Sequence, residues 1–297
     1  MFRPSASRPP FFWGTVLALC AAFAGQSLAS TPAAAAPAAP VSGYSVVERA
    51  GTFNSVSAHS VSAPCPRGKV VLAGGARIVN GGQRVLLRAS YPVRSLFGDR
   101  WIASAEEVVP GTSANWQIRS YAVCANRPAG LTYKSVTSGI SSGNIKFLPR
   151  VDCPGSTRLI GLGARIAGAG NRAGLNSITI TSGLSASARA SEAVATDQRW
   201  SVTSHAVCAR ALDLSFRESG WKRVGGPAQS GTAVANCPRG SKSFGVGVRL
   251  SATNAILNRL VPVGLRPTAT GSQVTVSEPA PGTPGTWYLK AQVLCAR

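Results

Sequence analysis

The sequence predicts an all-β protein built from three tandem copies of one disulfide-closed unit. Three observations predict it: a regular cysteine spacing, residues that recur at fixed offsets from those cysteines, and the apolar–polar alternation typical of half-buried strands. Each unit contains about six β-like runs between turn signals, and no stretch after residue 43 keeps a helical period. We expect antiparallel units, each a sandwich or an open barrel, arranged either as beads or as one pseudo-threefold prism of three sheets.

The cysteine spacing divides the chain into units. Six of the seven cysteines lie after residue 43, and the gaps between them are 59, 29, 55, 29 and 58 residues. Six cysteines in an exported chain are typical of disulfides, and the repeat favours pairing within each unit. A zinc site would need four ligands, commonly in CxxC pairs, and no such pair occurs. The expected disulfides are Cys65–Cys124, Cys153–Cys208 and Cys237–Cys295.

Other residues recur at the same offsets in all three copies. In each unit a glycine follows the first cysteine by ten residues, an arginine follows it by twelve, and a tryptophan precedes the second cysteine by eight. These repeated residues are Gly75, Gly163 and Gly247; Arg77, Arg165 and Arg249; and Trp116, Trp200 and Trp287. The units cover 44–127, 131–210 and 212–297, and joints of one to three residues imply that neighbouring units touch.

Two strands of each unit can be assigned to faces. In 116–124 and its copies every second residue is apolar or small, so the repeated tryptophans should pack in the core beside the disulfides. The opposite face, with Tyr121, His205 and Gln292, is expected to be solvent-exposed, so His205 is predicted to be a surface residue. The glycine-rich stretch 72–76 and its copies form a second strand. Bare backbone at the repeated glycine should let another segment approach closely.

The first 43 residues are interpreted as export sequence. Residues 1–29 are typical of a signal peptide, with Arg3 and Arg8 before an apolar run of 14 residues that is too short to span a bilayer. Residues 30–43 form an alanine- and proline-rich leader, and no later segment is a candidate membrane span. We therefore expect a secreted, periplasmic or cell-surface protein.

The chemistry-bearing residues do not indicate an enzyme. The chain has only two histidines and neither a GxSxG nor an HExxH motif. Glu106, Glu192 and Glu278 lie at similar distances before the second cysteine of each unit, and we expect them to pair with the repeated arginines as structural residues. No catalytic residue, cofactor or metal is expected.

Charge is the strongest indication of function. The 31 basic and 10 acidic residues give +21, and removing the two arginines of the signal peptide leaves +19. Most basic residues are arginines, which pair with phosphate, sulfate and carboxylate, although a genome rich in arginine codons is the alternative cause. Such a charge attracts polyanions, and nucleic acid only non-specifically. Trp101 and Trp221, which lack clear equivalents in the other units, and Arg119 are the candidates for ligand contact.

The unit resembles a repeat of uncharacterised secreted bacterial proteins. That repeat has a CPxG motif, a glycine-rich strand, a serine-proline turn, a tryptophan strand and an ending near YAxCA. Unit 1 carries these at 65–68, 73–76, 90–92, Trp101 and 121–125, whereas unit 2 has CPGS at 153–156 and unit 3 ends in QVLCA. The resemblance covers nearly all of the chain after the leader. It implies secretion and assigns no site residues.

These observations predict a secreted, non-enzymatic binding or cell-envelope protein that engages an anionic or glycan surface. One alternative is a hydrolase with an unfamiliar site, which predicts polar residues clustered in a single unit. The other is a protease inhibitor, whose rigid exposed loop would be 96–100 or 279–284.

Overall fold

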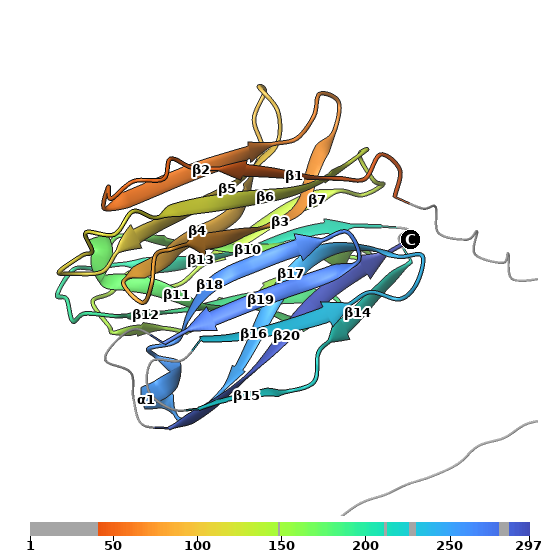
Figure 1. Ribbon diagram of the computed structural model, residues 1–297. Helices are drawn as coiled ribbons and strands as arrows, with labels where there is room; N and C mark the ends of the chain where they lie inside the picture. Colours follow the sequence, from red (N-terminus) through yellow and green to blue (C-terminus); the bar gives the residue numbers. More distant parts are fainter. Residues whose placement is uncertain (1–40, 148, 211–212, 226–229, 279–284) are drawn as a thin grey trace, which may run out of the picture. The chain divides into compact units, whose positions relative to one another are not determined.

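The computed structural model describes residues 41–297 except 148, 211–212, 226–229 and 279–284. The predicted signal peptide and most of the leader lie outside these residues. The protein is all-β, with 62% strand and 3% helix (Figure 1). Within the described ranges, no helix has the length and apolar character needed to cross a membrane.

Each unit contributes a run of strands. Unit 1 contains β1 (Ser45–Ala50), β2 (Ala58–Pro64), β3 (Val70–Val79), β4 (Val85–Val93), β5 (Arg100–Glu107) and β6 (Gln117–Ala125). Unit 2 contains β7 (Thr132–Thr137), β8 (Ile145–Lys146), β9 (Val151–Asp152), β10 (Arg158–Ala167), the 3-10 helix η1 (Gly170–Arg172), β11 (Ala173–Ser182), β12 (Ser185–Glu192) and β13 (Ser201–Ala209). Unit 3 contains β14 (Leu214–Glu218), β15 (Lys222–Gly225), β16 (Ser230–Asn236), β17 (Lys242–Ser251), α1 (Asn254–Leu257), β18 (Val261–Thr268), β19 (Gly271–Ser277) and β20 (Thr286–Ala296).

These strands form four sheets in a ring that resembles a four-bladed propeller. One six-stranded sheet has the order β1-β6-β3-β18-β19-β16 and joins units 1 and 3; the other, β2-β5-β4-β10-β13-β7, joins units 1 and 2. The two four-stranded sheets are β11-β12-β8 with β9 on β12, and β14-β20-β15 with β17 on β20. The predictions of three sandwiches or barrels and of a prism of three sheets are both corrected in this respect, because the described residues form four sheets and the strands of each unit are divided between two of them.

The repeated glycines explain how sheets cross from one unit to the next. A Cβ atom on Gly75 of β3 would lie 1.8 Å from the carbonyl oxygen of Leu265 on β18. One on Gly163 of β10 would lie 2.4 Å from the carbonyl oxygen of Ser90 on β4. Strand β3 pairs with β18, and β10 with β4, directly beside these glycines. The predicted close approach of another segment is therefore confirmed.

The core follows the predicted alternation. The three repeated tryptophans are at most 1% exposed, and each unit is closed by the disulfide expected from the spacing. The equivalent strands β3, β10 and β17 contact one another in pairs. Leu72, Ile160 and Phe244, each seven residues after the first cysteine of its unit, belong to one buried cluster. Side chains from all three units thus share one buried cluster.

The strand face with Tyr121, His205 and Gln292, predicted to be solvent-exposed, is partly covered by neighbouring units. Tyr121 is 2% exposed and Gln292 is 1% exposed, and His205 is half-buried. The prediction of a surface histidine is therefore wrong. The neighbouring unit packs over this position, which lies directly across from the repeated glycine in each unit.

Candidate anion-binding faces at the unit junctions

The units meet at three junctions, and each carries one repeated arginine at its surface. We call them face A (units 1 and 3), face B (units 1 and 2) and face C (units 2 and 3). Arg77, Arg165 and Arg249 are all exposed, two residues beyond the buried glycine and on the same side of the strand. None of the three forms an ion pair with a described acid. The predicted pairing with the repeated glutamates is therefore wrong.

In units 1 and 2 a glutamate accepts a hydrogen bond from the repeated tryptophan instead, whereas Glu106 forms an ion pair with Arg88 at 3.4 Å. Trp116 Nε1 donates to Glu107 Oε1 at 2.8 Å, and Trp200 Nε1 donates to Glu192 Oε1 at 3.2 Å. Glu107, rather than Glu106, is thus the equivalent of Glu192. A buried indole N–H is stabilised by an acceptor, and the carboxylate supplies it in units 1 and 2, whereas Trp287 Nε1 has no acceptor among the described residues. Within the part of the chain that the structure describes, the repeated arginines form no ion pair with an acid.

Face A surrounds the ring of Tyr121 with arginines. The guanidinium carbon of Arg266, on β18, lies 5.9 Å from the centre of this ring. Burial raises the pKa of the Tyr121 hydroxyl, as does the charge of Glu48, while Arg266, Arg77 and Arg119 oppose the rise. Arg119 forms an ion pair with Glu48 at 2.7 Å. Three guanidinium groups therefore share face A with one carboxylate.

Face B carries a cation on an aromatic stack. The guanidinium carbon of Arg165 lies 5.6 Å from the ring centre of Tyr91. Tyr91 stacks on His205, with ring centres 5.1 Å apart and planes 28° from parallel. Burial lowers the pKa of His205 to about 4, and Arg165 adds to this effect. The imidazole is therefore neutral at neutral pH, and Arg165 supplies the charge of the stack.

Face C places two cations beside an exposed indole. Trp221 is 44% exposed. The guanidinium carbon of Arg249 lies 5.9 Å from its ring centre and Lys290 Nζ lies 4.9 Å from it. Lys290 also forms an ion pair with Glu218 at 3.4 Å. Arg249 forms no ion pair with a described acid, so its guanidinium N–H groups can donate to a ligand.

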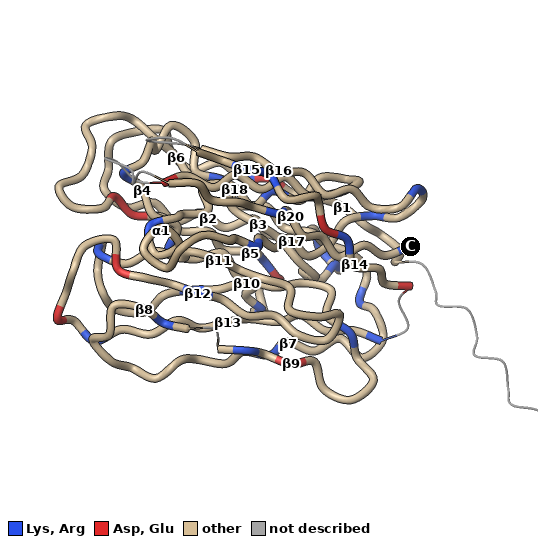
Figure 2. The backbone as a smooth tube through the Cα atoms, turned by 90° about the horizontal axis from the view of Figure 1, so that it is seen from below, with Lys and Arg blue, Asp and Glu red and all other residues tan. Residues whose placement is uncertain are grey.

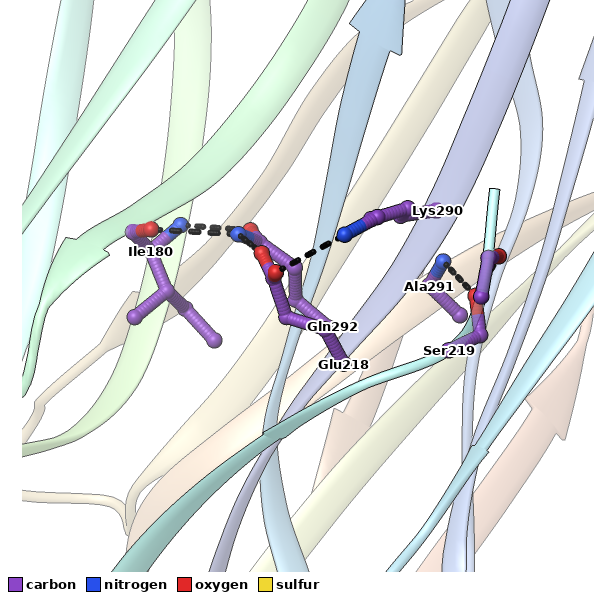
Figure 3. A network of polar contacts seen from close by, with 7 residues as sticks. Ile180, Glu218, Ser219, Lys290, Ala291 and Gln292 are labelled. Carbon is purple, nitrogen blue, oxygen red and sulfur yellow. Dashed lines mark hydrogen bonds and ion pairs between the residues drawn. The ribbon is translucent and has the colours of Figure 1, made fainter. Parts of the chain in front are cut away.

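A glutamine amide joins the strands beneath face C. Gln292 Oε1 accepts from the Ile180 N–H at 2.9 Å, and Gln292 Nε2 donates to the Ile180 carbonyl at 3.2 Å (Figure 3). Nε2 also donates to Glu218 Oε1 at 2.7 Å (Figure 3). The amide takes the place of a backbone pair between β11 and β20, so it connects units 2 and 3 and fixes Glu218 beside Lys290.

The three predicted ligand contacts have different outcomes. Trp221 is exposed on face C, and Arg119 lies on face A in its ion pair with Glu48. Trp101 is fully buried and its indole donates to Ser90 Oγ at 2.9 Å, so its prediction as a surface ligand contact is wrong. Tyr91 on β4 and Arg266 on β18 occupy equivalent positions and were not among the residues predicted to contact a ligand. An alignment of unit 1 with unit 3 that allows three extra residues in unit 3 places Tyr91 and Arg266 at the same position.

No model of a known protein family matches the chain, and no curated protein matches it either. The geometry of the three faces is therefore the basis for the function proposed below.

Proposed function

We propose that this chain is a secreted, non-enzymatic binding protein that engages an anionic polymer or anionic glycan surface through faces A, B and C. The observation that carries the proposal is the exposed repeated arginine at every junction, without an acidic partner among the described residues. Arg165 and Arg249 each lie beside an aromatic ring, and a guanidinium held in this way loses little freedom when it binds. Its N–H edge can then pair with phosphate, sulfate or carboxylate.

Triplication suits a polymeric ligand. We infer that the three units form a pseudo-threefold ring, so that the three faces are repeated around it. Each contact alone would be weak, but a polymer that reaches two faces binds the second at a high effective concentration. Basic positions elsewhere are spread over strands and loops (Figure 2). They would add long-range attraction at low salt.

Export is part of the proposal. Three disulfides fit an extracellular or periplasmic compartment, where such bonds persist. Residues 1–29 would direct the chain there, and the binding surface would meet envelope polymers or polymers in the medium.

The decisive experiment compares two sets of three charge removals. One variant carries Arg77→Gln, Arg165→Gln and Arg249→Gln. The matched control removes one exposed arginine per unit away from the faces: Arg67→Gln, Arg158→Gln and Arg239→Gln. Binding of heparin, polyphosphate and DNA is measured at several salt concentrations. The face variant should reduce the slope of log affinity against log salt by about two to three units, one for each lost contact.

The control variant should change the slope much less. Equal loss in both variants would mean that the net charge alone attracts polyanions, and the proposal would fail. Replacing the three face arginines with lysine keeps the charge but removes the planar fork. Weaker binding by the lysine variant is expected, whereas unchanged binding would exclude specific recognition by the arginines.

A second candidate function rests on an exposed turn between β4 and β5. Leu96 and Phe97 are almost wholly exposed, and the turn is closed by the Gly98 N–H donating to the Ser95 carbonyl at 3.1 Å. An exposed apolar side chain can enter the substrate pocket of a protease, and this turn belongs to one of the two loops predicted from the sequence. The other, 279–284, lies outside the described residues. Inhibition of a chymotrypsin-like protease that Phe97→Ala abolishes would support this candidate, and no inhibition by the wild type would exclude it.

A further inference from the structure

The turn between β4 and β5 in unit 1 is longer than its copies in the other units. Six residues, 94–99, separate β4 from β5, whereas two separate β11 from β12 and two separate β18 from β19. The three turns are equivalent, because the N–H of the first cysteine in each unit donates to a turn carbonyl, that of Asp99, Leu184 or Thr270. Two residues are enough to close such a hairpin, so the longer turn of unit 1 is not required by the fold.

The longer turn presents two adjacent apolar side chains to solvent. Leu96 is wholly exposed and Phe97 is 97% exposed. They occupy the central positions of a turn in which the Gly98 N–H donates to the Ser95 carbonyl at 3.1 Å and Ser95 Oγ donates to the Gly98 carbonyl at 2.9 Å. These hydrogen bonds hold the two side chains away from the fold, and adjacent exposed apolar groups of this kind indicate a partner that can bury them.

The acidic residue of this turn faces inwards. Asp99 is buried, and its Oδ2 accepts from the Val71 N–H at 3.3 Å and from the Tyr133 hydroxyl at 3.2 Å. The carboxylate therefore anchors the turn to units 1 and 2 and leaves no negative charge beside the exposed apolar pair.

Arginines lie around the base of the turn. Burial raises the pKa of the Tyr133 hydroxyl, and the charges of Arg94 and Arg127 oppose this rise, so both arginines are near Tyr133. Arg67 is exposed just after Cys65, whose N–H donates to the last residue of the turn at 2.9 Å. Arg67 and Arg127 are both exposed and form no ion pair with a described residue. Their guanidinium groups are thus available to a ligand.

The other units place exposed arginines at the same end of the molecule. Strand β4 runs antiparallel to β10, so Arg158 at the start of β10 lies at the end towards which β4 runs. Strand β18 likewise runs antiparallel to β3, and the turn after β18 accepts the Cys237 N–H, two residues before Arg239. Arg158 and Arg239 are exposed. Exposed arginines of all three units therefore share the end that carries the apolar pair.

We propose that Leu96 and Phe97 insert into the surface of an anionic lipid bilayer while the arginines at this end pair with lipid phosphates. Insertion of a few apolar groups and electrostatic attraction are each weak alone and together give peripheral membrane binding. A second copy of the chain fits less well, because two side chains offer far less than the roughly 800 Å² per partner of a stable interface. A protease pocket would take one side chain and leave the other and the arginines without a role. This surface is separate from faces A, B and C.

Vesicle co-sedimentation tests the proposal. The exported form, residues 30–297, is used, since the apolar run within residues 1–29 would bind lipid by itself. Vesicles of phosphatidylcholine are compared with vesicles that also contain phosphatidylglycerol. The wild type should bind the anionic vesicles at least ~10-fold more tightly, and Arg67→Gln with Arg127→Gln should weaken this binding about 25-fold, about fivefold for each arginine at the surface.

The apolar pair is tested by Leu96→Ser with Phe97→Ser. This variant should bind anionic vesicles about 100-fold more weakly, because two inserted side chains are lost. Phe53→Ser is the matched control: Phe53 is 51% exposed but precedes Asn54, which pairs with Trp116 at the other end of β6. Its vesicle binding should equal that of the wild type.

Fluorescence separates insertion from adsorption by charge alone. On anionic vesicles the emission of Phe97→Trp should shift to shorter wavelength and should be quenched by lipids with brominated acyl chains. Phe53→Trp should show no added shift or quenching relative to the wild type, because that position stays in water.

Several outcomes would overturn the proposal: no binding to anionic vesicles, equal binding to both kinds of vesicle, undiminished binding by the double serine variant, or no quenching in Phe97→Trp. Inhibition of a protease without vesicle binding would assign the turn to a protease instead. The double serine variant keeps every charge, so its heparin binding should match that of the wild type. Loss of vesicle binding with heparin binding intact therefore concerns this turn alone, and the reverse concerns faces A, B and C.

Discussion

Adding one methyl group at a repeated glycine should separate two units. In Gly75→Ala the new Cβ would lie 1.8 Å from the Leu265 carbonyl oxygen, so β3 and β18 must move apart by more than 1 Å to reach ordinary contact at about 3.4 Å. In Gly163→Ala the corresponding distance to the Ser90 carbonyl oxygen is 2.4 Å. Overpacking of this kind costs about 1–3 kcal/mol, and the loss of the short backbone ladder adds to it. We expect losses of about 3 kcal/mol for Gly75→Ala and about 2 kcal/mol for Gly163→Ala.

The assay is urea unfolding followed by tryptophan fluorescence, with the disulfides intact. Gly139→Ala is the matched control, because a Cβ there meets nothing within 4 Å. That change should be neutral or should stabilise the protein by up to about 1 kcal/mol by restricting the unfolded chain. If Gly75→Ala were as stable as Gly139→Ala, the close approach of β3 and β18 would not require glycine, and our explanation of the shared sheets would be refuted.

The remaining predictions concern the core, the titration of His205 and the disulfides. Trp200→Ala should lower the free energy of unfolding by about 3–5 kcal/mol through the cavity it leaves. In the wild type, iodide should quench the fluorescence of Trp221 well before that of the three repeated tryptophans. Equal quenching of all four would contradict the assignment of the repeated tryptophans to the core. The pKa of His205 is lowered to about 4, so between pH 6.5 and 4 the unfolded chain binds more protons than the folded one. Stability should therefore fall as the pH falls through this window, and His205→Gln should flatten the dependence in pH-dependent urea unfolding; an unchanged dependence would argue against a buried neutral imidazole. Non-reducing peptide mapping should recover only the three disulfides within units, and a peptide that joins cysteines of different units would disprove the pairing.

Several features of the site could not be predicted, because they depend on which strand of another unit lies alongside. Tyr121 and Gln292 occupy a polar parity, yet both are buried where a neighbouring unit covers them. Trp101 lacks an equivalent in the other copies, which suggested a ligand contact, but its indole is enclosed and donates to Ser90. The aromatic partner of Arg165 is Tyr91 of a different unit, so no local pattern indicates their contact.

The sequence by itself determined the unit, its disulfides and its core positions. Cysteine spacing and two-residue alternation act within one copy, so three copies repeat the same signal and strengthen it. Only the tertiary structure decided how the sheets continue between units and which arginines meet aromatic rings. The physical reason is that strand pairing between units uses backbone groups, which are the same in every residue. The partner strand is therefore chosen by the packing of the whole ring and not by any short stretch of side chains.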